Sequence, residues 1–288
     1  MAYPQPGSTP RLGAELVRPL KQAIASEVAA VFNDRARGER PVTRRTDGLF
    51  GPASVAWRVH GDVASMMVGG VAGLLLQMLH PKVLAGVWDH SKFRTDMQGR
   101  LRRTARFIAL TTYGSGDEAL EAIARVRRIH SHVRGVLPSG EPYVADDPDL
   151  LAWVHVTETT TFLGGWIRYA EPRMTLADQN RYFAEMAQVG SALGASPVPR
   201  SKAEARRLIE EMRPTLRTDE RTREVVRILM SQPAETALAG SITRLTMQSG
   251  VDLLPDWAQR MHGLRAPLAP LVRAGTLGVA RTLRWAFA

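Results

Sequence analysis

Apolar residues recur at helical spacing in segment after segment of this chain, and this restricts the fold more than any other feature. They return every three or four residues, in stretches separated by glycine, proline and polar residues. That period places them on one face of a helix. No segment of useful length alternates apolar and polar residues as a half-buried strand does. The sequence therefore predicts an all-α protein. The main helices are expected at residues 13–34, 62–79, 98–113, 117–134, 150–169, 175–193, 201–212, 218–231 and 233–248.

The longest uncharged apolar run extends from Val63 to Leu79 and contains three glycines and Gln77. A transmembrane helix needs roughly 20 apolar residues, so this run is at the lower limit. We interpret it as a buried core helix that stops before His80-Pro81, because a residue that precedes proline is pushed out of the helical region. The first residues lack the basic and apolar segments of a secretory signal, and we expect a cytoplasmic protein.

Composition excludes several kinds of site. The 288 residues include no cysteine, which rules out disulfides, thiolate haem ligation, iron–sulfur clusters and cysteine zinc sites. The net charge of +10 is compatible with nucleic acid, an anionic membrane surface or acidic groups on a ligand. Aromatic residues are not interleaved with the basic runs and no nucleic-acid-binding signature is present, so we expect no nucleic-acid partner.

The stretch from Gly263 to Ala288 has four arginines and no acidic residue, among many apolar side chains. A basic amphipathic helix of this kind can lie on an anionic membrane surface, which would make the protein membrane-associated. It can equally dock on the body of the protein, and the sequence leaves both alternatives open.

Two histidines occur two residues apart in the arginine-rich stretch "RVRRIHSHVRG", residues 125–135. Positions i and i+2 lie about 200° apart around a helix, so His130 and His132 cannot both face inward. His130 belongs to an apolar stripe with Ile129 and Val133, whereas His132 lies on the polar face. His130 is therefore the candidate ligand, although a single histidine on an apolar stripe is more often a core residue held by hydrogen bonds.

Arginine is in excess around this histidine. Residues 100–135 hold eight arginines and three acidic residues. One explanation is a haem whose iron binds His130 and whose propionates pair with arginines at the pocket rim. The alternative is a pair of ordinary solvent-facing helices. The histidines are too scattered to favour a zinc or di-iron site.

Four segments, taken in order and spacing, resemble a known family. They are "GGVAGLLLQMLHPKVLAGVWDHSKF" (69–93), "GRLRRTARF" (99–107), "RVRRIHSHVRG" (125–135) and "YVADDPDLLAWVH" (143–155). Over roughly residues 45–250 the chain is similar to the haem-dependent oxygenase domain shared by bacterial rubber oxygenases (latex-clearing proteins) and the fungal oxygenase MpaB. The resemblance implies a single helical domain that binds haem b.

The resemblance also implies roles for individual residues. The family's proximal histidine falls on His130, and Arg127 lies in the same motif near the haem. A second motif falls on Arg100, Arg103 and Thr104, which would approach the distal side of the haem or its propionates. In this reading Arg100 or Arg103 stabilises bound dioxygen or a developing anion. The helices at 63–79 and 150–169 are expected to wall a pocket for a hydrophobic substrate.

Two departures bear on the activity. Rubber oxygenases have lysine at the position of Arg103, and arginine does not readily ligate iron. They also carry a catalytic glutamate upstream of this motif, whereas residues 79–88 contain no carboxylate and Asp89 is the nearest acid. These differences argue against rubber cleavage and leave open an oxygenase that acts on another lipophilic substrate.

The leading hypothesis is therefore a haem b oxygenase that acts with dioxygen on an alkene, terpenoid or other lipid. The alternative is a non-catalytic helical protein that binds haem or lipid, at the membrane periphery or elsewhere. The expected organisation is an N-terminal segment and helix (1–44), the haem-oxygenase-like domain (45–250) and the basic amphipathic tail (251–288).

Overall fold

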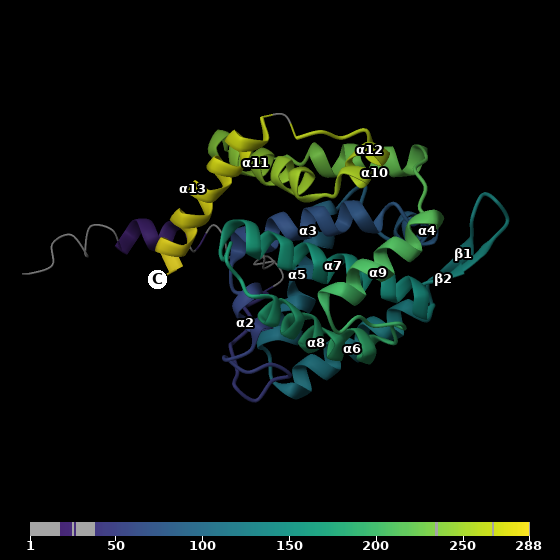
Figure 1. Cartoon of the computed structure of the whole chain (residues 1–288), viewed down its shortest axis with the longest axis horizontal. Coiled ribbons are helices and arrows are strands. Elements are labelled where there is room, and N and C mark those ends of the chain that lie inside the picture. Colours follow the sequence, from purple (N-terminus) through teal and green to yellow (C-terminus); the bar gives the residue numbers. More distant parts are fainter. Residues whose placement is uncertain (1–17, 25, 27–37, 234–235, 267, 288) are drawn as a thin grey trace, which may run out of the picture.

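The computed structural model describes residues 18–24, 26, 38–233, 236–266 and 268–287, and helices make up most of this part (Figure 1). Its helices are α2 (Val55–His60), α3 (Val63–Gln77), α4 (Pro81–His90), α5 (Met97–Tyr113), α6 (Gly116–His130), α7 (Pro148–Tyr169), α8 (Leu176–Leu193), α9 (Lys202–Met212), α10 (Glu220–Met230), α11 (Ala237–Leu253), α12 (Asp256–His262) and α13 (Ala269–Phe287). A 3₁₀ turn (Arg213–Thr215) and two strands, β1 (Arg134–Val136) and β2 (Pro142–Val144), complete it. The all-α prediction is confirmed. Of the helix expected at 13–34, residues 18–24 and 26 are described and are helical, and the rest lies outside the described residues.

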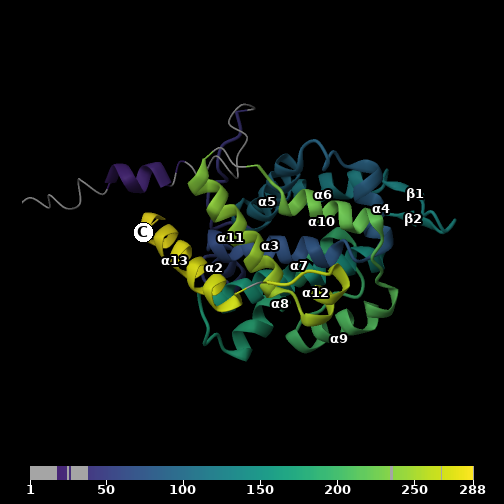
Figure 2. The ribbon, with the colours of Figure 1, turned by 90° about the horizontal axis from the view of Figure 1, so that it is seen from above.

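Helices α3 and α7 pack along each other in the middle of the molecule, with the other helices around them (Figures 1 and 2). Glycine allows this close approach. A Cβ added at Gly69 would come 2.8 Å from the carbonyl oxygen of Thr161, and one added at Gly165 would come 2.5 Å from that of Ser65. The run from Val63 to Leu79 is thus a mostly buried core helix, as expected.

Local signals define the ends of both central helices. The Asp62 side chain accepts a hydrogen bond from the Ser65 amide and caps the start of α3. The helix ends at Gln77, before His80-Pro81. Helix α7 has Pro148 in its first turn and the Asp147 side chain as its cap. Capping aspartates therefore mark the starts of α3 and α7, and the His80-Pro81 pair follows the end of α3.

The helix expected at 117–134 ends earlier, at His130. The chain then forms the antiparallel hairpin of β1 and β2, in which Gly135 pairs with Tyr143. A Cβ at Gly135 would lie 2.6 Å from the Tyr143 hydroxyl, so glycine is needed at this crossing. Strands of three residues are too short to show a recognisable period, which is why the sequence did not reveal the hairpin.

Helix α13 docks on the body, against α11 and α3. Its Arg284 pairs with Asp62 at 2.6 Å, and its Arg273 pairs with Asp252 of α11 at 2.7 Å. The alternative of a tail that packs on the protein is thus the one seen in the structure. In the described part of the chain, no single helix meets the length and hydropathy of a membrane span. Helices α3 and α4 would do so only together, and they are bent by 105° where they meet.

Candidate active site

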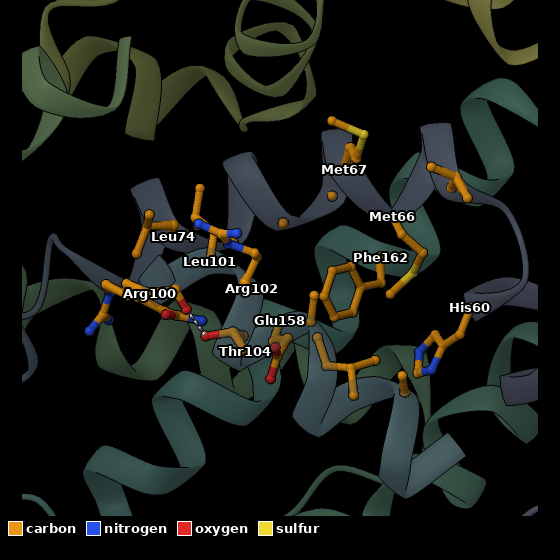
Figure 3. A pocket seen from close by; sticks show the side chains of 18 of the residues that line it. His60, Met66, Met67, Leu74, Arg100, Leu101, Arg102, Thr104, Glu158 and Phe162 are labelled. Atoms are coloured by element: carbon orange, nitrogen blue, oxygen red, sulfur yellow. Dashed lines mark hydrogen bonds between the residues drawn. The ribbon is translucent and has the colours of Figure 1, made fainter. Parts of the chain in front are cut away.

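A mostly apolar cavity of about 310 Å³ lies between α3, α5 and α7 (Figure 3). This volume is in the range of small-molecule sites. Helices α3 and α7 both contribute to its wall, as the sequence predicted for the segments 63–79 and 150–169. A second hollow beside α12 and α13 is lined mainly by polar groups, and its Arg168 and Arg273 already pair with Asp252. The first cavity is therefore the candidate site.

The cavity owes its space to glycine in α3 and to one face of α5. A Cβ at Gly70 would lie 3.8 Å from the Phe162 ring, with room to spare, so the glycine leaves this part of the wall open. Helix α5 contributes Arg100, Thr104 and Ile108, which follow one another at intervals of four residues and so share a face.

Arg100 is a positive charge in the cavity wall. Its half-buried guanidinium has no hydrogen bond or ion pair with any side chain in the described residues. Burial, and to a smaller extent the charge of Arg103, lower the pKa of Arg100 to about 10, so it stays protonated at neutral pH. Thr104 lies one turn further and donates its hydroxyl to the Arg100 carbonyl at 3.3 Å. This end of the cavity therefore offers an unpaired cation and a hydroxyl group.

Arg103 does not lie at the end of the cavity that Arg100 and Thr104 line. Its side chain is exposed and forms a salt bridge of 3.3 Å with Asp96, the residue that caps α5. It does not line the cavity. Of the three residues predicted to act together, the structure brings Arg100 and Thr104 to the cavity and leaves Arg103 outside.

Glu158 of α7 is the cavity residue that the sequence reasoning missed. It lies between Thr104 and Phe162 in the view of Figure 3. Burial raises the pKa of its carboxyl group to about 7. Among the described residues, no group hydrogen-bonds to this carboxyl or forms an ion pair with it. An isolated acid in the middle of a long apolar helix was the available signal, because buried carboxyl groups are rare.

His60 stands at the opposite end of the cavity from Arg100 (Figure 3). Its Nδ1 lies 2.8 Å from Thr112 Oγ1 and its Nε2 lies 2.9 Å from the Tyr182 hydroxyl. Burial lowers the pKa of His60 to about 3, so the ring is neutral. Both nitrogens are engaged, and the ring could bind a metal only by giving up one of these bonds.

His130 and Arg127 lie outside the cavity wall. His130 ends α6, and burial lowers its pKa although Asp146 opposes the shift. Among the described residues nothing hydrogen-bonds to its ring. Arg127 donates to the Ala192 carbonyl of α8 at 3.3 Å. The residues implied for the haem thus fall into two groups in the structure, and only Arg100 and Thr104 line the cavity.

His130 and His132 lie on different faces at the end of α6, as the helical spacing predicted. His132 is exposed and its Nδ1 lies 2.7 Å from the Arg128 carbonyl oxygen, as expected for the polar face. His130 is half-buried. Ile129, placed in the same stripe, is instead 52% exposed. Because the helix ends at His130 and turns into the hairpin, its last turn does not pack as a longer helix would.

Asp89, the acid nearest to residues 79–88, does not line the cavity. Asp89 accepts a hydrogen bond of 2.7 Å from the Tyr143 hydroxyl and lies 3.8 Å from Arg221. It therefore serves the contact between α4 and the hairpin. Within the residues described, no three His, Asp or Glu side chains are grouped so that they could hold a metal ion. An iron centre here would depend on a single protein ligand, as haem allows.

Comparison with known families gives one match. Residues 57–286 match the family described as "ER-bound oxygenase mpaB/B'/Rubber oxygenase, catalytic domain". The chain belongs to this family. The match covers most of the sequence and bears out the resemblance carried by the four segments. No curated protein and no solved structure matches the chain.

Proposed function

We propose that this member of the MpaB and rubber oxygenase family acts with dioxygen on a small lipophilic substrate, with haem b as its cofactor. The observation that carries the proposal is the apolar cavity between α3, α5 and α7, whose wall includes Arg100 and Thr104 from one family motif. An apolar pocket with a few polar groups is typical of sites for lipophilic molecules.

The donor chemistry around His130 suits haem. Burial lowers the pKa of its imidazole, which favours the neutral form that binds iron, and no protein group within the described residues hydrogen-bonds to its ring. Arg127, three residues earlier on the same helix, would pair with a propionate in place of the Ala192 carbonyl. When bound, haem supplies the redox chemistry that activates dioxygen.

The residues of the cavity have separate tasks in this proposal. Arg100 keeps a positive charge in an apolar wall, where it would stabilise negative charge that develops during the oxidation of the substrate. Thr104 offers its hydroxyl beside it. Phe162, Met66 and Leu74 provide the apolar surface that holds the substrate and excludes water. Arg103 could contribute to the cavity wall only if its salt bridge with Asp96 were broken.

The haem assignment is tested by absorption spectroscopy. Wild-type protein, His130→Ala and His132→Ala are purified from haem-supplemented cells and compared at equal concentration. We expect a Soret band in the wild type and in His132→Ala, and its loss in His130→Ala. His132 is the matched control because it lies two residues away on the exposed face. A wild-type spectrum without a Soret band would remove haem from the proposal.

A second candidate, lipid binding at the membrane periphery, is favoured by the exposed apolar side chains of α13. Leu271 is 67% exposed and Phe287 is 52% exposed. Two of the four tail arginines are neutralised by Asp252 and Asp62, which reduces the attraction to anionic lipid. Removing the tail would also uncover α3, so point variants are the better test.

This candidate is tested by flotation with anionic vesicles of phosphatidylserine and phosphatidylcholine. Leu271→Gln and Phe287→Gln are expected to reduce the bound fraction severalfold if α13 contacts the lipid. Leu176→Gln is the control, because Leu176 is 61% exposed on α8 and lies outside the tail. Equal flotation of the tail variants and the wild type would exclude a role for this helix at the membrane.

A further inference from the structure

Glu158 is the single acidic residue in the described wall of the cavity. Its neighbours on α7 do not partner it, because Thr157, Thr159 and Thr161 donate their hydroxyls back to carbonyls of the same helix. Glu158 is half-buried, and polar side chains inside native proteins nearly always have a hydrogen-bond partner. A carboxyl group that faces a cavity without one is an unused binding group.

The packing leaves room for a ligand beside Glu158. Glu158 lines the cavity, and a Cβ added at Gly70 of the facing helix α3 would meet only the Phe162 ring, at 3.8 Å. Phe162 follows Glu158 by one helical turn and forms apolar wall next to it (Figure 3). A ligand that reaches the carboxyl group would therefore place the rest of its body against apolar side chains.

The titratable groups in and behind the cavity wall determine which charges a ligand would meet there. His60 is neutral, with its Nε2 2.9 Å from the Tyr182 hydroxyl. Tyr182 is fully buried, and its pKa is raised by burial and by the charges of Glu158 and Glu185. Tyr113, on α5, has its pKa raised to about 12 by burial and stays neutral. The cations in the wall are Arg100 and Arg102.

No salt bridge joins these arginines to Glu158 in the described residues. The carboxyl group is therefore available to a ligand. A ligand ammonium group would be repelled by the two arginines, and a ligand carboxylate would be repelled by the ionised form of Glu158. A neutral hydrogen-bonding group avoids both costs.

We propose that the cavity takes a lipophilic molecule with one neutral oxygen group, a ketone or an alcohol, which hydrogen-bonds to the carboxyl group of Glu158. This inference rests on the proposed function and specifies its substrate class. A pure hydrocarbon would leave the carboxyl group without a hydrogen-bond partner, which disfavours its binding. The polar group thereby fixes which part of the substrate lies near Arg100 and Thr104.

The affinities of the site for ketones and for alcohols should depend on pH in different ways. A ketone only accepts hydrogen bonds, so it binds the protonated carboxyl group and not the carboxylate. An alcohol can also donate a hydrogen bond to the carboxylate, so its affinity should depend less on pH. With a pKa of about 7 for Glu158, the affinity for a ketone should fall about thirtyfold between pH 6 and pH 8.5.

The experiment measures binding of 2-nonanone, 1-nonanol and 1-nonene to the full chain by isothermal titration calorimetry at pH 6 and pH 8.5. The variants are Glu158→Gln, which stays neutral and keeps a donor, and Glu158→Leu, which is also neutral but has no hydrogen-bonding group. Glu211→Gln, an exposed carboxylate on α9, is the control. Thermal unfolding of each variant verifies that it is folded.

We expect wild-type protein and Glu211→Gln to prefer 2-nonanone over 1-nonene at pH 6 and to lose this preference at pH 8.5. Glu158→Gln should bind the ketone equally at both values. Glu158→Leu should bind 1-nonene at least as tightly as the ketone. Ketone affinity that is independent of pH in the wild type, an unchanged preference in Glu158→Leu, or no binding of any probe would overturn the inference.

The test does not depend on turnover, so the two proposals can fail separately. If the ketone binds as expected but no ketone or alkene is oxidised with dioxygen, the oxygenase proposal fails and the binding site remains. If alkenes are oxidised while Glu158→Leu binds all probes like the wild type, the oxygenase proposal remains and the role of Glu158 is wrong.

Discussion

Two adjacent glycines of α3 differ in what surrounds them. A Cβ at Gly69 would come 2.8 Å from the Thr161 carbonyl oxygen and 2.9 Å from the Phe162 Cα, which are backbone atoms that cannot move aside alone. A Cβ at Gly70 would meet only the edge of the Phe162 ring at 3.8 Å. Gly69 is therefore required by packing, whereas Gly70 leaves space in the cavity.

The first prediction contrasts these two positions. Gly69→Ala should lower the free energy of unfolding by about 1–3 kcal/mol, because α3 and α7 must separate to accept the methyl group. Gly70→Ala should be neutral or stabilising by up to about 1 kcal/mol, because alanine favours the helix and finds room. Urea unfolding of both variants measures this. Equal destabilisation would contradict the packing described for Gly69.

At the scale of helices, sequence reasoning succeeded where the signal lies within one element. The period of the apolar residues predicted α3, α5, α7 and α8 to within a few residues, and His80-Pro81 limited α3 correctly. The hairpin after α6 was missed because its strands are too short to show a period. The resemblance to the family implied Arg100, Arg103 and Thr104 as site residues, and the structure places Arg100 and Thr104, but not Arg103, in the cavity wall. Which helices face one another depends on tertiary packing, so Glu158 did not emerge as a residue of this wall.

The second prediction concerns the contact of α13 with α3. Arg284→Gln removes the charged partner of Asp62, whose side chain is 6% exposed, and leaves the Ser65 amide as its hydrogen-bond donor among the described residues. We expect a loss of about 1–3 kcal/mol, below that of a fully buried pair because Arg284 is partly exposed. Arg281→Gln is the control, since Arg281 is exposed one turn earlier on the same helix.

Hydrogen exchange localises the effect of this variant. Faster exchange in α13 and in the first turn of α3 is expected for Arg284→Gln and not for Arg281→Gln. If both variants unfold like the wild type, the ion pair does not hold α13 on the body.

At the scale of the whole molecule, buried titratable groups make the stability depend on pH. Burial lowers the pKa of His60 to about 3, and that of His80 and His155 to about 4. In the unfolded chain these rings titrate near pH 6.5. Between those values the unfolded state binds protons that the folded state does not, so stability falls as pH falls through this window.

The titration of Glu158 changes the stability in the direction opposite to that of the three histidines. Because its pKa is raised from 4.5 to about 7, the folded state holds a proton that the unfolded state releases, and its contribution lowers stability as pH rises through this range. The three histidines together contribute more to the pH dependence of stability than Glu158 does in the opposite direction. We therefore expect the free energy of unfolding to fall by several kcal/mol between pH 6.5 and pH 4.

Urea unfolding at pH 7, 5.5 and 4.5 measures this third prediction. Glu158→Gln should show a steeper loss on acidification than the wild type, because the opposing contribution is gone. His132→Gln, at an exposed ring, should follow the wild type. A wild-type free energy of unfolding that is constant from pH 7 to pH 4.5 would show that the three rings are not held neutral by burial.

The pairing of Asp62 with Arg284 spans 222 positions of the sequence. During synthesis at roughly 5–20 residues per second, α3 leaves the ribosome about 10–40 s before the arginine that will neutralise its capping carboxylate. Any packing of α3 on α7 that occurs before α13 is synthesised therefore takes place while this carboxylate lacks its arginine partner. The ion pair between Asp62 and Arg284 can form only near the end of synthesis, because Arg284 lies in the last helix.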